Sequence, residues 1–130
     1  MIEREQILEQ LWYDRKSIEK YGYLKIHNIE LTDMQLNLMF INRQYGKTFM
    51  DMCDLMYCAR NYDNFYVAWD AEEIPSGERL FIPQDPDIMG LRMRKDNYLY
   101  ALLKFIEKYF PEYTTKLNRT NLHVTKGVKL

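Results

Sequence analysis

The sequence predicts an α+β fold with about four helices, a small antiparallel sheet and a C-terminal arm. Apolar residues recur at spacings of three and four in four segments, and their spacing changes to two after residue 64. The 130 residues are 47% hydrophobic and 28% charged, which suits one compact domain with its own core. We therefore expect a single domain over residues 1–111, followed over residues 112–130 by a polar basic tail or an added strand.

The N-terminal segment has the pattern of an amphipathic helix followed by a strand. Helical spacing predicts a helix over residues 3–21, and Gly22 would end it because glycine readily adopts a left-handed backbone. Residues 23–30 alternate imperfectly between apolar and polar side chains, so we expect a short strand there. The apolar stripe of the helix consists of Ile7, Leu8, Leu11, Trp12 and Ile18.

Two further helices are predicted in the middle of the chain. Thr32–Gln35 form a capping box, which would start a helix over 33–45, and apolar spacing predicts another over 49–60. The pair has roughly the lengths of a helix-turn-helix that reads DNA. The second helix, however, carries Asp51 and Asp54, which would repel phosphate. Ordinary helix packing therefore explains the pair better.

The C-terminal half predicts a hairpin and a final helix. Side chains alternate after residue 64, and the Pro-Ser-Gly sequence at 75–77 has turn chemistry. We therefore expect a β-hairpin near residues 65–82 with a long acidic loop. Apolar residues at helical spacing then predict a helix over 95–110, which Pro111 would stop.

Charge is unevenly distributed although the net charge is only -1. Residues 61–90 carry seven acids and one base, whereas residues 91–130 carry nine bases and three acids. The two blocks could pair within one molecule, pair between copies, or remain solvated. The predicted acidic patch consists of Asp63, Asp70, Glu72, Glu73, Glu78, Asp85 and Asp87. The predicted basic patch consists of Arg92, Arg94, Lys95, Lys116, Arg119, Lys126 and Lys129.

Little in the chain indicates catalysis. Serine, cysteine and histidine occur only twice each, no Gly-x-Ser-x-Gly sequence occurs, and the five glycines are scattered singly. Asp51 with Asp54, and Asp70 with Glu72 and Glu73, are the best carboxylate groups for a divalent ion, but neither group has a lysine at the spacing of a nuclease. We expect no enzyme, no catalytic residue, no metal and no cofactor.

The N-terminus lacks a signal peptide or spanning segment, so a cytoplasmic location without membrane contact is expected, or the virion if the chain is phage-encoded. Cys53 and Cys58 are predicted to be buried thiols in a helix. The abundance of Asn, Ile, Lys, Tyr and Met, with only four alanines, is typical of AT-rich genomes such as those of many phages and mobile elements.

Aromatic composition favours an interaction surface. Eleven tyrosines and eight methionines exceed what so small a core buries, and these residue types are enriched in interfaces. We expect a non-catalytic protein-interaction or assembly subunit, such as a phage or mobile-element structural adaptor or a small inhibitor, which binds a protein partner or forms a homo-oligomer. The alternative is a small DNA- or RNA-binding protein using the helix pair within 33–60 and the basic C-terminal third. The predicted interface residues are Tyr62, Tyr66, Trp69, Tyr100 and Tyr113.

Overall fold

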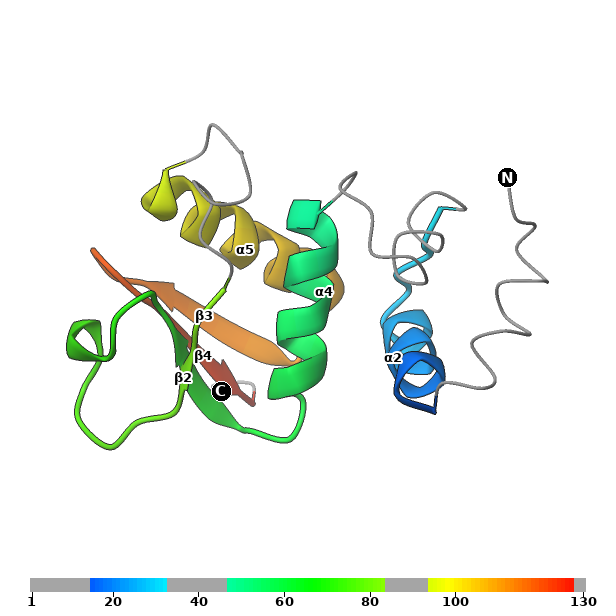
Figure 1. Ribbon diagram of the computed structural model, residues 1–130, viewed down its shortest axis with the longest axis horizontal. Helices are drawn as coiled ribbons and strands as arrows, with labels where there is room; N and C mark the ends of the chain where they lie inside the picture. Colours follow the sequence, from blue (N-terminus) through cyan, green and yellow to red (C-terminus); the bar gives the residue numbers. More distant parts are fainter. Residues whose placement is uncertain (1–14, 33–46, 84–93, 128–130) are drawn as a thin grey trace. The chain divides into compact units, whose positions relative to one another are not determined.

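The computed structural model describes residues 15–32, 47–83 and 94–127 (Figure 1). The chain divides into two compact units, Met1–Tyr57 and Cys58–Leu130. Within the described residues it has three α-helices and a four-stranded sheet, which confirms the α+β class with one helix fewer than the expected four. The predicted helix over 33–45, and the first part of the helix predicted over 3–21, lie outside the described residues.

In the first unit, helix α2 spans Arg15–Ile26 and therefore passes through Gly22. The predicted stop at Gly22 and the predicted strand over 23–30 are both wrong. The helix ends at Ile26, and Asn28, two residues beyond it, has a left-handed φ of 60°. The Ile29 N–H donates to the Leu24 carbonyl at 3.0 Å and the Asn28 N–H to the Lys25 carbonyl at 3.0 Å, which is a Schellman motif. Leu24 and Ile29 are both buried, and the burial of these two residues accounts for the position of the helix end better than the glycine does.

Helix α4 spans Lys47–Ala59 and confirms the helix predicted over 49–60, although its last two residues belong to the second unit. Polar contacts join it to α2. Lys20 forms an ion pair with Asp54. The Tyr57 hydroxyl donates to Glu19 Oε2 at 3.0 Å, and the Tyr57 ring lies edge-on to Tyr23 with centroids 5.9 Å apart. These contacts link α2 to α4 within the first unit.

The second unit is built on a sheet with strand order β2-β1-β4-β3. β1 is antiparallel to β4, and β3 forms an antiparallel hairpin with β4. β1 and β2 are parallel, so the predicted hairpin near 65–82 is wrong. The strands span Asn64–Val67 (β1), Leu80–Phe81 (β2), Tyr113–Leu117 (β3) and Leu122–Lys126 (β4).

The physical reason for the parallel pairing is the connection between β1 and β2. A 3₁₀ helix, η1 (Ala71–Glu73), lies in this connection, which carries the chain back to the start of β1. The Tyr66 N–H then donates to the Arg79 carbonyl at 2.8 Å, and the Ala68 N–H to the Phe81 carbonyl at 3.3 Å. β2 therefore runs in the same direction as β1, and β4 supplies the antiparallel partner of β1 from the far end of the sequence.

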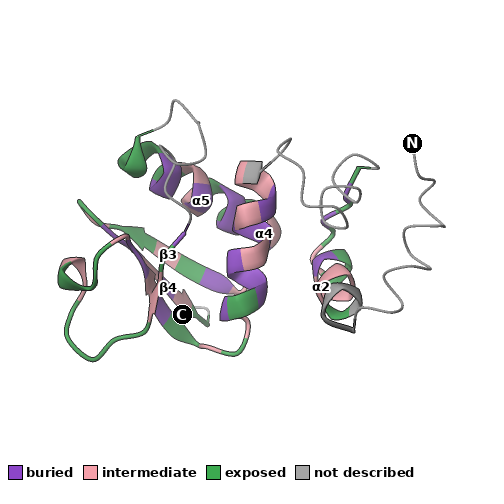
Figure 2. Ribbon diagram, in the orientation of Figure 1, coloured by how far each residue is buried: buried purple, intermediate pink, exposed green. Residues whose placement is uncertain are grey.

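Helix α5 spans Lys95–Tyr109, which confirms the final helix predicted over 95–110, and it packs against β3. Figure 2 shows buried residues on this helix and on the strands. The segment expected to be a tail or one added strand supplies two strands, and Leu122 and Val124 in β4 are fully buried. The core of this unit includes Phe65, Val67, Tyr98, Leu102, Ile106, Phe110, Leu122 and Val124.

Candidate interaction surface

The sheet has a buried inner face and a more exposed outer face. Phe65 and Val67 point inward and are fully buried, whereas Asn64 and Tyr66 alternate with them on the other side. We define the outer face as the residues of the four strands whose side chains lie on the same side of the sheet as those of Asn64 and Tyr66. It consists of Asn64, Tyr66, Leu80, Thr114, Lys116, His123 and Thr125.

An aromatic pair lies in the middle of the outer face. The rings of Tyr66 and His123 are stacked, with centroids 4.1 Å apart and planes inclined by 3°. His123 Nε2 lies 2.6 Å from Asn64 Oδ1, and Asn64 Nδ2 donates to Glu78 Oε2 at 3.4 Å. Lys116 is the register partner of His123 on β3. The face therefore presents an aromatic pair with a cation on the adjacent strand.

The β3 edge, meaning the side of Tyr113–Leu117 that faces away from β4, is the second feature of this surface. The Gly127 N–H donates to the Glu112 carbonyl at 2.9 Å, and the Asn118 N–H to the Asn121 carbonyl at 2.8 Å. Because hydrogen-bonded pairs alternate along antiparallel strands, even-numbered residues of β3 bond to β4. The N–H and C=O groups of Thr115 and Leu117 therefore point away from the sheet.

No strand within the described ranges pairs with the β3 edge. The opposite edge of the sheet is β2, which has only two residues and is followed within the same segment by Pro83. Short strands and prolines protect a sheet edge against pairing with another chain. β3 has five residues, exposed side chains at Thr114 and Lys116, and a Leu117 side chain that is 40% exposed. Of the two sheet edges formed by the described residues, β3 is therefore the one suited to accept another strand.

The structure does not bring the five predicted interface residues together. Tyr66 lies on the outer face, whereas Tyr113 is buried in the core, where its ring approaches those of Phe65 and Phe110. Tyr100 is 53% exposed on α5. Tyr62 lies beside β2, with its ring centroid 5.5 Å from that of Phe81.

Trp69, the fifth of these residues, is half-buried at the end of β1. Its ring lies edge-on to Tyr98 at 5.6 Å, and Lys95 Nζ lies 5.6 Å from the ring centroid. Its Nε1 atom is buried and has no hydrogen-bond partner among the described residues. Trp69 thus connects the sheet to the start of α5.

The described part of the acidic patch lies mainly in the connection between β1 and β2. Asp70 caps η1, because its Oδ1 accepts from the Glu72 N–H at 3.0 Å. Asn121, buried in the β3–β4 turn, donates from Nδ2 to the Glu73 carbonyl at 2.7 Å and so ties η1 to that turn. Asp63 and Glu78 are also exposed, whereas Asp85 and Asp87 lie outside the described residues.

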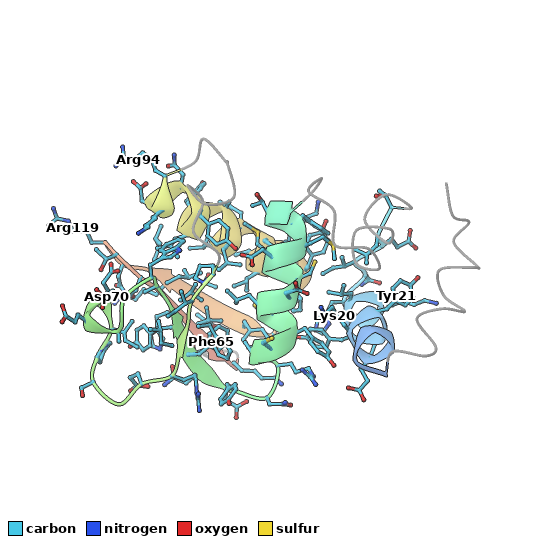
Figure 3. All side chains as sticks on the ribbon, viewed as in Figure 1. Lys20, Tyr21, Phe65, Asp70, Arg94 and Arg119 are labelled. Carbon is cyan, nitrogen blue, oxygen red and sulfur yellow. The ribbon has the colours of Figure 1, made fainter. Side chains whose placement is uncertain are left out.

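The described basic residues are dispersed. Arg94 precedes α5 and pairs with Asp96 at 3.2 Å, Lys95 lies over Trp69, and Lys126 lies over the Tyr113 ring at 5.9 Å. Arg119 is exposed in the β3–β4 turn, and Figure 3 shows it at the same end of the unit as Asp70. None of the ion pairs among the described residues joins the two patches. Lys116 lies on the outer face, whereas Arg92 and Lys129 lie outside the described residues.

The two cysteines have different environments. Cys53 is fully buried, as predicted, but Cys58 is exposed on the last turn of α4. Burial raises the pKa of the Cys53 thiol to about 12, and Asp54 acts in the same direction. Because the thiolate is the reactive form, we expect iodoacetamide at pH 8 to modify Cys58 and to spare Cys53. Mass spectrometry of the intact protein checks this: labelling of both thiols at equal rates would contradict it.

The same pKa shift predicts a pH dependence of stability. The raised pKa of Cys53 means that the unfolded chain releases the thiol proton near the ordinary value of 9.0, whereas the folded chain retains it. The folded state then binds more protons, so the free energy of unfolding is expected to fall as the pH rises above about 9. Urea denaturation of the native chain and of Cys53→Ala at pH 8 and pH 10 measures this decline, which should be smaller in the variant because it lacks the contribution of the Cys53 thiol.

Some features of this surface were not predicted from the sequence. The outer-face cluster of Asn64, Tyr66 and His123 comes from residues far apart in the chain, and the β3 edge depends on strand order. In the described parts of the chain, no three His, Cys, Asp or Glu side chains gather closely enough to hold a metal ion. Among the described helices, none combines the length and apolar character that a membrane span needs. Comparison with protein-family models, with curated proteins and with solved structures finds no match to this chain.

Proposed function

We propose that this chain is a non-catalytic protein-interaction or assembly subunit that receives a partner strand along the β3 edge. The observation that carries the proposal is the direction of the Thr115 and Leu117 backbone groups, which point away from β4. When an extended segment adds to such an edge, main-chain hydrogen bonds supply affinity and neighbouring side chains supply specificity. A structural adaptor of a phage or mobile element, or a small inhibitor, would use the edge in this way.

The side chains along the β3 edge support this role. Threonine and tyrosine favour extended backbone, and Leu117 offers an apolar contact at the end of the strand. Lys116 is the only charged residue in β3, so a partner strand needs to accommodate only one charge along these five residues.

Thr115→Pro tests the proposal without removing any hydrogen bond between β3 and β4. Proline lacks the N–H that points outward at this position, and edge strands tolerate it there. The tagged full-length chain would be isolated from cells that naturally produce it, and its complexes measured by native mass spectrometry. We expect complexes with the native chain and with Thr115→Ala, and their loss with Thr115→Pro. Identical complexes in all three samples would contradict the proposal.

A second candidate function, binding of single-stranded nucleic acid, is favoured by the stacked Tyr66 and His123 beside Lys116. Such ligands bind by base stacking on aromatic side chains and by phosphate contacts to cations. Anisotropy of a labelled oligonucleotide at two salt concentrations tests it. Tyr66→Ala and Lys116→Glu should both weaken a salt-sensitive affinity, whereas Tyr100→Ala, on α5, should not. Failure of the native chain to bind would remove this candidate.

A further inference from the structure

The residues of the β3 edge are complementary to a second copy of the same edge. Residues 115 and 117 have their N–H and C=O groups on the side away from β4, and residues 114 and 116 have theirs toward β4. The Tyr113 N–H donates to the Phe110 carbonyl at 3.0 Å, so this N–H is already used within the chain. When two copies of β3 run antiparallel with odd-numbered residues opposite odd-numbered residues, the outward N–H groups of each copy face outward C=O groups of the other. A closed two-fold pairing requires this kind of self-complementary edge.

We propose that two copies of this chain pair antiparallel along β3, about a two-fold axis through Thr115, and so join their sheets into one. The inference rests on the proposed function, because it assigns a partner to the same edge. At the axis, the Thr115 N–H of each copy donates to the Thr115 carbonyl of the other. The joined sheet has eight strands, twice the four that the described residues of one chain form.

The charges and side chains select this register over its neighbours. A pairing centred on Lys116 would place two lysines directly opposite each other, which is destabilising. A pairing centred on Thr114 would place Thr115 opposite Tyr113 and Leu117 opposite Pro111. Neither the Thr115 nor the Leu117 carbonyl would then receive a hydrogen bond, because the Tyr113 N–H donates to Phe110 and proline has no N–H. That register would also bring Glu112 opposite Lys116, but an ion pair exposed to solvent contributes little.

The register centred on Thr115 avoids the lysine pair and gives both the N–H and the carbonyl of Thr115 a partner. The Leu117 carbonyl receives no hydrogen bond in it, because the Tyr113 N–H opposite donates to Phe110. Lys116 faces Thr114 of the second copy, so no like charges meet. Leu117, whose side chain is 40% exposed in one chain, comes to lie opposite Tyr113 of the second copy. Cross-strand pairs of an aromatic and an aliphatic residue, and pairs of threonines, are favourable in antiparallel sheets. Thr115 meets itself at the axis.

The first experiment measures the mass of the purified full-length chain by light scattering over a range of concentrations. We expect the mass to rise toward twice that of one chain. Thr115→Pro should raise the dissociation constant of this dimer by about tenfold or more, because it removes both hydrogen bonds at the axis. Thr115→Ala keeps the N–H and should change the constant by about threefold at most. Circular dichroism of each variant verifies that it is folded.

Disulfide formation tests the register. In an antiparallel sheet the Cα atoms of a hydrogen-bonded pair are about 5.5 Å apart, which is within the range that a disulfide spans. Oxidation of Thr115→Cys, in a Cys58→Ser background, should give a covalent dimer. Thr114→Cys and Lys116→Cys in the same background should give none or much less. A covalent dimer formed mainly by Thr114→Cys or Lys116→Cys would overturn the proposed register.

The outcomes distinguish this inference from the proposed function. A purified chain that stays monomeric at every concentration overturns self-pairing, and so does a dimer that Thr115→Pro leaves unchanged. The proposed function survives the first result if complexes from the native cells still depend on the Thr115 N–H. If those complexes are also insensitive to Thr115→Pro, both proposals fail.

Discussion

A chain that ends at Pro111 is expected to lose the tertiary structure of its second unit. The cut removes β3 and β4, and β4 lies between β1 and β3 in the sheet. Leu122 and Val124 would be deleted, and Phe65 and Val67 would lose the strand beside them, although all four are fully buried in the whole chain. Their burial contributes about 6–12 kcal/mol, at roughly 1.5–3 kcal/mol each. That is comparable with the entire stability of a small domain, about 5–15 kcal/mol.

Amide NMR spectra measure this effect directly. We expect the dispersed resonances of the second unit to collapse to random-coil positions in the shortened chain. Addition of a synthetic peptide covering residues 112–127 provides the control, because it returns both strands and should restore part of the dispersion. A shortened chain with the native resonances of Tyr98 and Leu102 would show that the core does not depend on β4.

Replacement of Phe65 by alanine is expected to lower the free energy of unfolding by about 3–5 kcal/mol. Phe65 is fully buried on β1, and its ring lies edge-on to Phe81 at 5.3 Å and to Tyr113 at 6.1 Å. Alanine leaves a cavity between these two rings, and strands on both sides of β1 would have to move to close it. Urea denaturation followed by circular dichroism gives the change.

Tyr66→Ala is the matched control, because it removes an aromatic ring from the next residue of the same strand. Its ring lies on the outer face and contacts His123. We expect a loss of about 1 kcal/mol, the usual contribution of an aromatic pair. Equal losses for the two variants would contradict the assignment of inner and outer faces.

Local sequence patterns predicted where the helices lie more accurately than they predicted which strands pair. The apolar residues that define α4 lie within one short segment of the sequence, and the same is true of α5. Their spacing alone was therefore enough to locate both helices. The alternation from Phe65 also identified β1 as a strand. The turn expected at residues 75–77 exists, with the Glu78 N–H donating to the Pro75 carbonyl at 3.3 Å and Gly77 at a φ of 85°. It does not form a hairpin, because η1 precedes it and changes the direction of the chain.

The end of α2 was predicted at the wrong residue, and the β3 edge was not predicted at all, for different reasons. Gly22 suggested a stop, but α2 continues to Ile26 and is followed by the turn that buries Leu24 and Ile29. Tyrosine abundance indicated contact surfaces without distinguishing Tyr113, which is buried, from Tyr100, which is exposed. The β3 edge could not be located before the strand order was known, since exposure of an edge is a property of the whole sheet.

The position of β4 also has a consequence for folding during protein synthesis. β4 pairs with β1 across 59 residues, as from Phe65 to Val124, yet it occupies an interior position of the sheet. Ribosomes add about 5–20 residues per second, so β1 is made roughly 3–12 s before its antiparallel partner. Throughout that interval β4 is not yet available to pair with β1 and to help bury Phe65 and Val67. The second unit therefore completes its fold only after β4 has left the ribosome, and slow translation lengthens the period in which the nascent chain is prone to aggregate.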